Sequence, residues 1–392
     1  AAADLRPVME PTFHPGGADP GDSSTWGNAM GAYLTMASVG GLIFGIINIV
    51  GNFGTVFVDQ AYWQRAIAAQ PSSTVRGFLL GGMCWFSIPF TLATTMGLTA
   101  VALGVSLTPE QVQLGLTVPA AASVMMGEVG AIMVLVMLFM AVTSAGSAEL
   151  IAVSSLITYD VYRTYKNPAA TGKQLLKVSR TVIVVFGLGM GVLAGILLGM
   201  GLSLGFVYLA MGILIGSAVI PIALTITWSK CSRGGAVSGA LIGVILALIT
   251  WTSIAAAESP TGSVDIGSLG GAFPMLFGNV VAILSSGFIC VVVSLAQNKK
   301  YDWKDLNPKM VIVEADMTEE VKANIAQAAV DEATLKKAFK FSLKGGGILT
   351  IVTIILWPMP LYFSGYVFDI GFYGFWVSIA IVWVSVAAFT II

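Results

Sequence analysis

Four polar residues lie within otherwise apolar stretches of the chain, and their types could bind a solute or an ion. Asn48 and Asn52 are one helical turn apart, Glu149 follows a run of small residues, and Tyr208 lies in a later apolar stretch. In hydrocarbon such groups are stable when they bond to a ligand, an ion or another helix. Amides and a phenol can bind a neutral polar solute, and a carboxylate can take up a proton.

Each of these residues also has a packing explanation. The asparagines can bond to neighbouring helices, Tyr208 can belong to a packed core, and Glu149 can stay protonated against another helix. Gly45, Gly51 and Gly54 accompany the asparagines. They can allow close packing, or they can let the helix unwind and expose its backbone to a ligand.

The composition is that of a membrane protein. Hydrophobic residues make up 56 % of the chain and charged residues 10 %, whereas about 25 % of the residues of a soluble protein are charged. The net charge of -1 argues against a nucleic acid as partner. The sequence contains no nucleotide loop, zinc motif or nucleophile elbow, so neither an enzyme nor a cofactor is expected.

Nine apolar segments have about the 20 residues that a helix needs to cross a bilayer. They are 31–57, 76–103, 129–158, 179–200, 203–228, 235–256, 271–297, 346–364 and 368–392. We therefore expect an all-α polytopic membrane protein with about nine transmembrane helices. Apart from Arg6, the basic residues lie in or beside every second link, which the positive-inside rule places in the cytoplasm. The N-terminal segment is then outside and the C-terminus inside.

A polar insert at 298–345 is expected on the cytoplasmic side. Its second part places apolar residues at helical spacing among Glu and Lys, which predicts an amphipathic helix. The insert can serve as a solvated connector or as a regulatory surface.

Two strings of residues resemble the sodium:solute symporter family. They are DQAYWQRAIAA at 59–69 and TSAGSAELIAVSSLITYDVYR at 143–163. The first contains the polar motif residues Asp59, Gln60, Gln64 and Arg65. Together with FLLGGMCWFSIPFTLATTMGL and VYLAMGILIGSAVIPIA, the resemblance is to the urea active transporters of plants and fungi, and it covers essentially the whole chain.

The resemblance implies the leucine-transporter-type fold, which is built from two inverted five-helix repeats. On this basis residues 30–228 form the second repeat, preceded by an extracellular lead-in loop at 1–29. Two additional transmembrane helices follow at 229–297, and two C-terminal ones at 346–392. The first repeat is missing from this sequence, so the chain is expected to need it as a partner for transport.

The resemblance also implies roles for individual residues. Asn52 falls where sugar-transporting members have a substrate-binding asparagine, and Thr55 where they have a nearby tyrosine. Ala141 matches a position whose carbonyl binds sodium, and Ser144 matches the first of two hydroxyl residues there. The second hydroxyl position is Ala145, whose side chain carries no oxygen, so only a vestigial sodium site is expected.

The expected function is secondary active transport of urea, coupled to protons rather than to sodium. Asn48 and Tyr208 are expected to join Asn52 in binding urea. Glu149 is expected to take up the proton, because it lies about one turn from the missing hydroxyl and no Lys or Arg of this sequence is expected at its depth. The alternatives are a sodium-coupled carrier of another small polar solute and a membrane sensor or scaffold with a transporter fold. The expected location is the plasma membrane.

Overall fold

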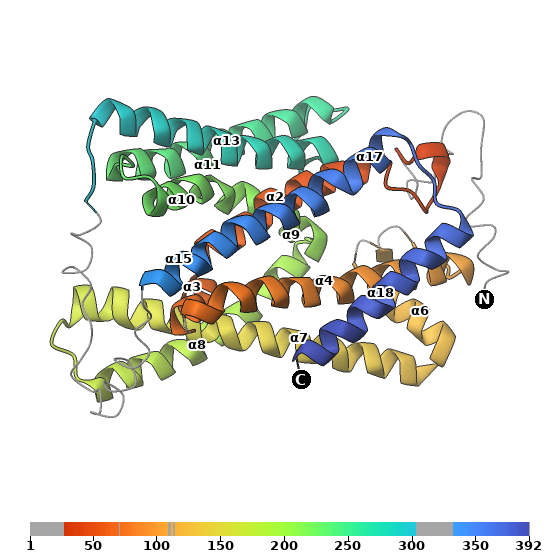
Figure 1. Ribbon diagram of the computed structural model, residues 1–392, viewed down its shortest axis with the longest axis horizontal. Coiled ribbons are helices and arrows are strands. Elements are labelled where there is room, and N and C mark those ends of the chain that lie inside the picture. The colour runs from red at the N-terminus through yellow and green to blue at the C-terminus, as the bar shows by residue number, and fades with distance from the viewer. Residues whose placement is uncertain (1–26, 70, 109–110, 113, 303–331, 392) are drawn as a thin grey trace. The chain divides into compact units, whose positions relative to one another are not determined.

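The computed structural model of this protein describes residues 27–69, 71–108, 111–112, 114–302 and 332–391. Almost all regular structure in these residues is helical (Figure 1). The elements are η2 (Ala29–Gly31), α2 (Val39–Val58), α3 (Gln60–Ala68), α4 (Pro71–Ala102), α6 (Thr117–Met126), α7 (Glu128–Ser155), η3 (Leu156–Lys166), α8 (Gly172–Gly199), α9 (Leu204–Ile215), η4 (Gly216–Ala218), α10 (Val219–Thr227), α11 (Arg233–Glu258), α12 (Ile266–Leu269), α13 (Ala272–Gln297), α15 (Glu332–Phe341), η8 (Ser342–Gly346), α16 (Gly347–Thr350), η9 (Ile351–Leu356), α17 (Pro358–Phe363) and α18 (Ile370–Ile391).

Eight helical stretches among the described residues are long and apolar enough to cross a membrane. They are Val39–Val58, Ser73–Ala102, Glu128–Lys166, Gly172–Gly199, Leu204–Thr227, Arg233–Glu258, Ala272–Gln297 and Ala333–Phe363. The last predicted span, 368–392, corresponds to α18, where the apolar stretch Gly371–Trp383 is shorter. The chain is therefore an all-α polytopic membrane protein.

Large apolar side chains are exposed on the outer faces of these helices. Leu188 on α8 is 68 % exposed and Phe288 on α13 is 71 % exposed. In water such a surface would make the protein aggregate, but a bilayer solvates it. The helices therefore hide little apolar area from one another and pack mainly through small residues.

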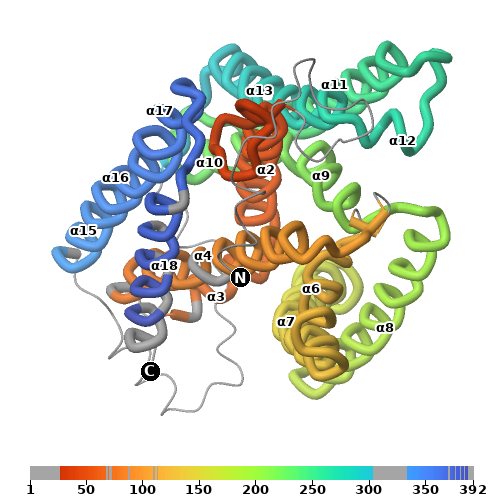
Figure 2. The backbone as a smooth tube through the Cα atoms, turned by 90° about the vertical axis from the view of Figure 1, so that its right-hand side faces the viewer, coloured from red at the N-terminus to blue at the C-terminus, as the bar shows by residue number. Residues whose placement is uncertain are grey.

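Most of the predicted lead-in loop at 1–29 and most of the predicted insert at 298–345 lie outside the described residues. From the insert the structure describes α15 and η8. Helix α15 carries the spaced apolar residues and lysines that predicted an amphipathic helix. It runs on through α16 and η9 into α17 as one continuous rod (Figure 2).

The chain divides into two compact units. The first unit comprises residues 1–42, 66–142 and 329–392, and the second comprises residues 43–65 and 143–328. In the first unit, Met96 and Ala100 of α4 pack against Ala121 and Ala122 of α6. The α6–α7 turn passes through Gly127, whose φ of 63° suits a residue without a Cβ.

Helices α11 and α13 form the most extensive contact of the second unit, and they lie side by side in Figure 1. Gly235, Gly239 and Gly243 recur every fourth residue of α11 and therefore form one stripe along it. A methyl group at Gly239 would meet the Ser286 carbonyl oxygen of α13 at 2.6 Å. Substitution by Ala there should cost about 1–3 kcal/mol through overpacking.

The predicted span 203–228 is interrupted in the structure. Helix α9 ends at Ile215, a 3₁₀ turn covers Gly216–Ala218, and α10 continues from Val219. Pro221 explains the break, because proline lacks an N–H and its ring clashes with the carbonyl four residues earlier, here that of Ser217. The interruption orients α9 independently of α10, and α9 carries Tyr208.

Candidate functional site

A hydrogen-bonded cluster joins α2 to α9 inside the second unit. The Tyr208 hydroxyl lies 2.6 Å from Asn48 Oδ1 and 3.2 Å from Asn52 Oδ1. It can donate its proton to either oxygen, since a phenol has one proton to give. We call Asn48, Asn52 and Tyr208 the amide–phenol cluster. Its members carry no formal charge at neutral pH.

The amide–phenol cluster is open on one side. Tyr208 is 40 % exposed, so it is not a buried core residue. The Asn48 Nδ2 donates to the Phe44 carbonyl at 2.8 Å. The structure gives the Asn52 Nδ2 no hydrogen-bond partner among the described residues, and Asn52 is exposed. This amide can therefore donate to the carbonyl oxygen of a small solute.

The two asparagines share a face because α2 is a regular helix, in which residues four apart lie one above the other. Gly51 and Gly54 of the same helix are buried and pack against α9. A methyl group at Gly51 would lie 3.9 Å from the Met211 methyl, and one at Gly54 would meet Ile215 at 2.8 Å. The helix is unbroken across the glycines. They serve close packing here rather than unwinding, which holds α9 near enough for Tyr208 to reach α2.

Thr55 lies one turn beyond Gly51 on α2 and faces α9. Its hydroxyl lies 3.1 Å from the Gly51 carbonyl oxygen and 3.6 Å from the Met211 sulfur. The structure thus brings Thr55 to the same pair of helices as the amide–phenol cluster. The Thr55 hydroxyl already donates its hydrogen bond to the backbone of its own helix. Thr55 therefore has no free donor for a solute, unlike Asn52.

A second polar group, which is charged, lies in the same unit. Asp59 and the Arg65 guanidinium of α3 both lie close enough to the Glu149 carboxyl of α7 to act on it electrostatically. We call Glu149, Asp59 and Arg65 the carboxyl–guanidinium cluster. The sequence predicted no Lys or Arg at the depth of Glu149, and the structure adds that Arg65 lies within electrostatic range of it. Helix α3, which follows directly after α2, carries Arg65.

Asp59 is held in place by the backbone. Its Oδ1 accepts from the Ala61 N–H at 2.8 Å, as a helix N-cap residue does. The chain breaks between α2 and α3 at this residue. Gln60 and Gln64 lie one turn apart on α3. The sequence contained a signal for this turn, because an Asp followed by a polar amphipathic stretch is typical of a helix start.

The expected sodium position lies on the same helix as Glu149. Ala141 and Ser144 are exposed on α7, and the Ser144 carbonyl accepts from the Ser147 hydroxyl at 3.0 Å. Ala145 contributes no side-chain oxygen. In the part of the chain that the structure describes, no group of three or more His, Cys, Asp and Glu residues could hold a metal ion.

Comparison with known proteins gives several matches. The profile of the sodium:solute symporter family matches residues 17–243. The urea-proton symporter DUR3 of Oryza sativa subsp. japonica is 48 % identical over 369 residues, which cover 93 % of this chain and 50 % of that protein. The urea active transporter of Saccharomyces cerevisiae is 34 % identical over 433 residues, covering 93 % of this chain and 58 % of that protein.

A third relative is the probable urea active transporter 1 of Schizosaccharomyces pombe. It is 41 % identical over 377 residues, which cover 93 % of this chain and 55 % of that protein. The chain thus spans about half the length of the curated relatives that it matches. No solved structure matches it.

Proposed function

Because this chain belongs to the sodium:solute symporter family, we propose that it carries urea-binding residues of a urea symporter. The family consists of transporters rather than enzymes. Three relatives whose names specify urea match 93 % of the chain. Since the chain spans about half of their length, the proposal concerns the transporter that contains this sequence.

The observation that carries the proposal is the Tyr208 hydroxyl lying between Asn48 and Asn52. Urea is a small, planar, neutral molecule with four N–H hydrogens and one carbonyl oxygen. The asparagine and tyrosine oxygens can accept from its N–H groups, and the Asn52 Nδ2 can donate to its carbonyl. Once a bound solute covers the cluster, a polar group left without a partner costs about 1–3 kcal/mol, so such a site rejects solutes that lack these groups.

The coupling ion that we propose is the proton. Two neighbouring carboxyl groups repel each other when both are ionised, so the Glu149–Asp59 pair is suited to bind and release a proton. The name of the rice relative also specifies a proton. A sodium ion needs oxygen ligands, and Ala145 supplies none from its side chain.

Coupling gives this function its driving force. One charge that moves through 100 mV supplies about 2.3 kcal/mol, which corresponds to a urea gradient of about fifty-fold. The test is uptake of radiolabelled urea by cells that lack urea transport of their own and express the full transporter. We expect accumulation above the external concentration, loss of accumulation with a protonophore, and no competition by sugars or amino acids. Urea that only equilibrates would contradict the coupling, and equal competition by proline would contradict the substrate.

We also propose a plasma-membrane location with the C-terminal end of the chain in the cytoplasm. The test uses single cysteines at Thr261, in the link after α11, and at Lys166, at the end of η3, in a variant without Cys84, Cys231 and Cys290. In intact cells, an impermeant thiol reagent should label the cysteine at Thr261 and spare the one at Lys166. The reverse labelling pattern would overturn this orientation.

A further inference from the structure

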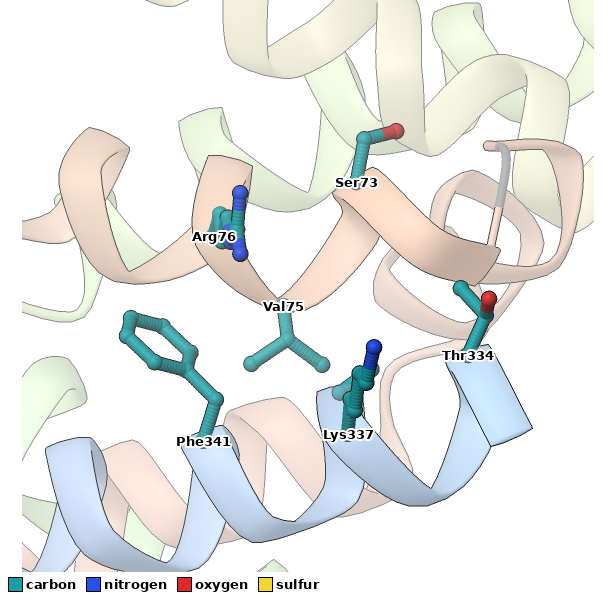
Figure 3. A pocket seen from close by; sticks show the side chains of 7 residues that line it. Ser73, Val75, Arg76, Thr334, Lys337 and Phe341 are labelled. Atoms are coloured by element: carbon teal, nitrogen blue, oxygen red, sulfur yellow. The ribbon is translucent and has the colours of Figure 1, made fainter.

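A cavity of about 330 Å³ lies between α4 and α15, entirely within the first unit (Figure 3). Helix α4 contributes Ser73, Val75 and Arg76, and helix α15 contributes Thr334, Lys337 and Phe341. None of these residues belongs to the amide–phenol cluster or to the carboxyl–guanidinium cluster. The cavity is at the lower end of the roughly 300–1,000 Å³ typical of small-ligand sites.

The lining of the cavity combines two cations with two hydroxyl groups. The described residues that line it include Arg76 and Lys337 but no Asp or Glu. Figure 3 shows the Lys337 ammonium pointing toward α4, across the cavity from its own helix. Two cations that face one space repel each other, and an anion between them would remove that repulsion.

Arg76 is partly oriented before any ligand arrives. Its guanidinium carbon lies 5.5 Å from the centroid of the Phe341 ring, which is a cation–π contact. A guanidinium placed against a ring keeps its N–H groups at the edge of its plane, where they can bind an oxyanion in bidentate fashion. Val75 and Phe341 approach each other in Figure 3 and give the cavity an apolar wall.

The cavity lies at the ends of two candidate membrane spans, Ser73–Ala102 and Ala333–Phe363. Exposed apolar residues begin nearby, with Phe78 on α4 and Leu343 on η8. The lining residues therefore lie where hydrocarbon gives way to lipid headgroups. The sequence places this end on the cytoplasmic side, where a membrane carries its anionic lipids.

We propose that the cavity between α4 and α15 binds a phosphate group at the membrane surface. Arg76 supplies a bidentate pair of donors, and Lys337 supplies a point charge from the opposite helix. The lipid that fits is anionic, with its phosphate in the cavity and its glycerol beside Val75 and Phe341. Such a lipid would link the start of α4 to α15. A soluble phosphate compound shares this chemistry and is distinguished by experiment.

The experiment uses the purified full transporter in detergent and native mass spectrometry to count bound lipids. The probes are dioleoyl phosphatidic acid, dioleoyl phosphatidylcholine as a zwitterionic reference, and inorganic phosphate as the soluble source. We expect phosphatidic acid to bind at least about tenfold more tightly than phosphatidylcholine, because charge-assisted hydrogen bonds to phosphate are strong. Arg76→Gln combined with Lys337→Gln should remove this preference.

The matched control combines Arg180→Gln with Lys340→Gln. It removes the same charge from exposed residues that do not line the cavity, and it should keep the preference. Lys337→Gln alone changes an exposed position and leaves the Arg76–Phe341 contact intact, so it tests the cavity with little risk to the fold. Lys337→Arg keeps the positive charge and should restore the preference for phosphatidic acid.

The outcomes are clear-cut. Loss of binding in the cavity variants but not in the control supports a lipid phosphate. Saturable binding of inorganic phosphate that depends on Arg76 and Lys337, without a lipid preference, supports a soluble phosphate in the same cavity. Equal lipid binding by wild type and the double cavity variant, together with no binding of inorganic phosphate, would overturn the proposal.

Discussion

Two polar clusters of the second unit share helix α2 and its continuation, but they differ in charge. The amide–phenol cluster of Asn48, Asn52 and Tyr208 is neutral. Its Tyr208 hydroxyl lies within hydrogen-bond distance of the side-chain oxygens of both asparagines. The carboxyl–guanidinium cluster contains Asp59, which lies seven residues after Asn52, at the break between α2 and α3.

The difference in charge suits two different tasks. A neutral solute is recognised by the positions of donors and acceptors, and a fixed charge nearby would favour ions over it. The energy for accumulation comes instead from a group that changes its charge. The accumulation ratio at equilibrium depends on the ion gradient and the stoichiometry, whereas the KM depends on contacts with the solute. Variants in the two clusters should therefore have separable effects.

The largest effect is expected for Glu149→Gln in the full transporter. An amide cannot bind and release a proton in this pH range, so urea accumulation should fall from about fifty-fold at 100 mV to no gradient. Exchange of urea across the membrane should persist with a KM within about twofold of wild type. Both quantities are measured with radiolabelled urea between about pH 5 and pH 8.

The control for this variant is Glu258→Gln, which removes a carboxylate from the exposed end of α11. Uptake by the control should match that of wild type. If Glu149→Gln keeps both its pH dependence and its accumulation, the charged cluster has no coupling role and the contrast between the two clusters disappears.

A smaller effect is expected for Asn52→Ala. Removal of an amide that bonds to urea should cost about 1–3 kcal/mol, which raises the KM by roughly 5- to 150-fold. The accumulation ratio at saturating urea should not change. Thr252→Ala, at an exposed residue of α11 that bonds to its own helix, is the control. An unchanged KM at normal surface expression would remove Asn52 from the site.

The smallest effect is expected for Tyr208→Phe. This variant keeps the ring but removes the hydroxyl that lies between the two asparagines, at a cost of about 0.5–1.5 kcal/mol. The KM should therefore rise by roughly two- to tenfold. Tyr159→Phe on η3 is the matched control, since Tyr159 is similarly exposed at 47 %. If Tyr208→Phe lowers the urea accumulation ratio by a larger factor than it raises the KM, the two clusters do not have separate effects on coupling and binding.

Much of the fold could be predicted from the sequence. A membrane span must satisfy its backbone hydrogen bonds internally, so an apolar stretch of sufficient length is a helix whatever surrounds it. Eight predicted spans correspond to such helices among the described residues. The common face of Asn48 and Asn52 likewise follows from helical periodicity alone. Local patterns of this kind need no knowledge of the partner helix.

Which residues meet depends on how the helices pack. Tyr208 reaches Asn48 across 160 positions of the chain, and no periodicity encodes that contact. The role of the glycines in α2 was open until the structure placed Gly51 and Gly54 against α9. Arg65 was assigned to a link, yet α3 places it within electrostatic range of Glu149. The helices and their polar faces could thus be predicted from the amino-acid sequence, because both depend on local spacing. The pairing of those faces depends on contacts between distant segments, and these exist only once the helices have packed.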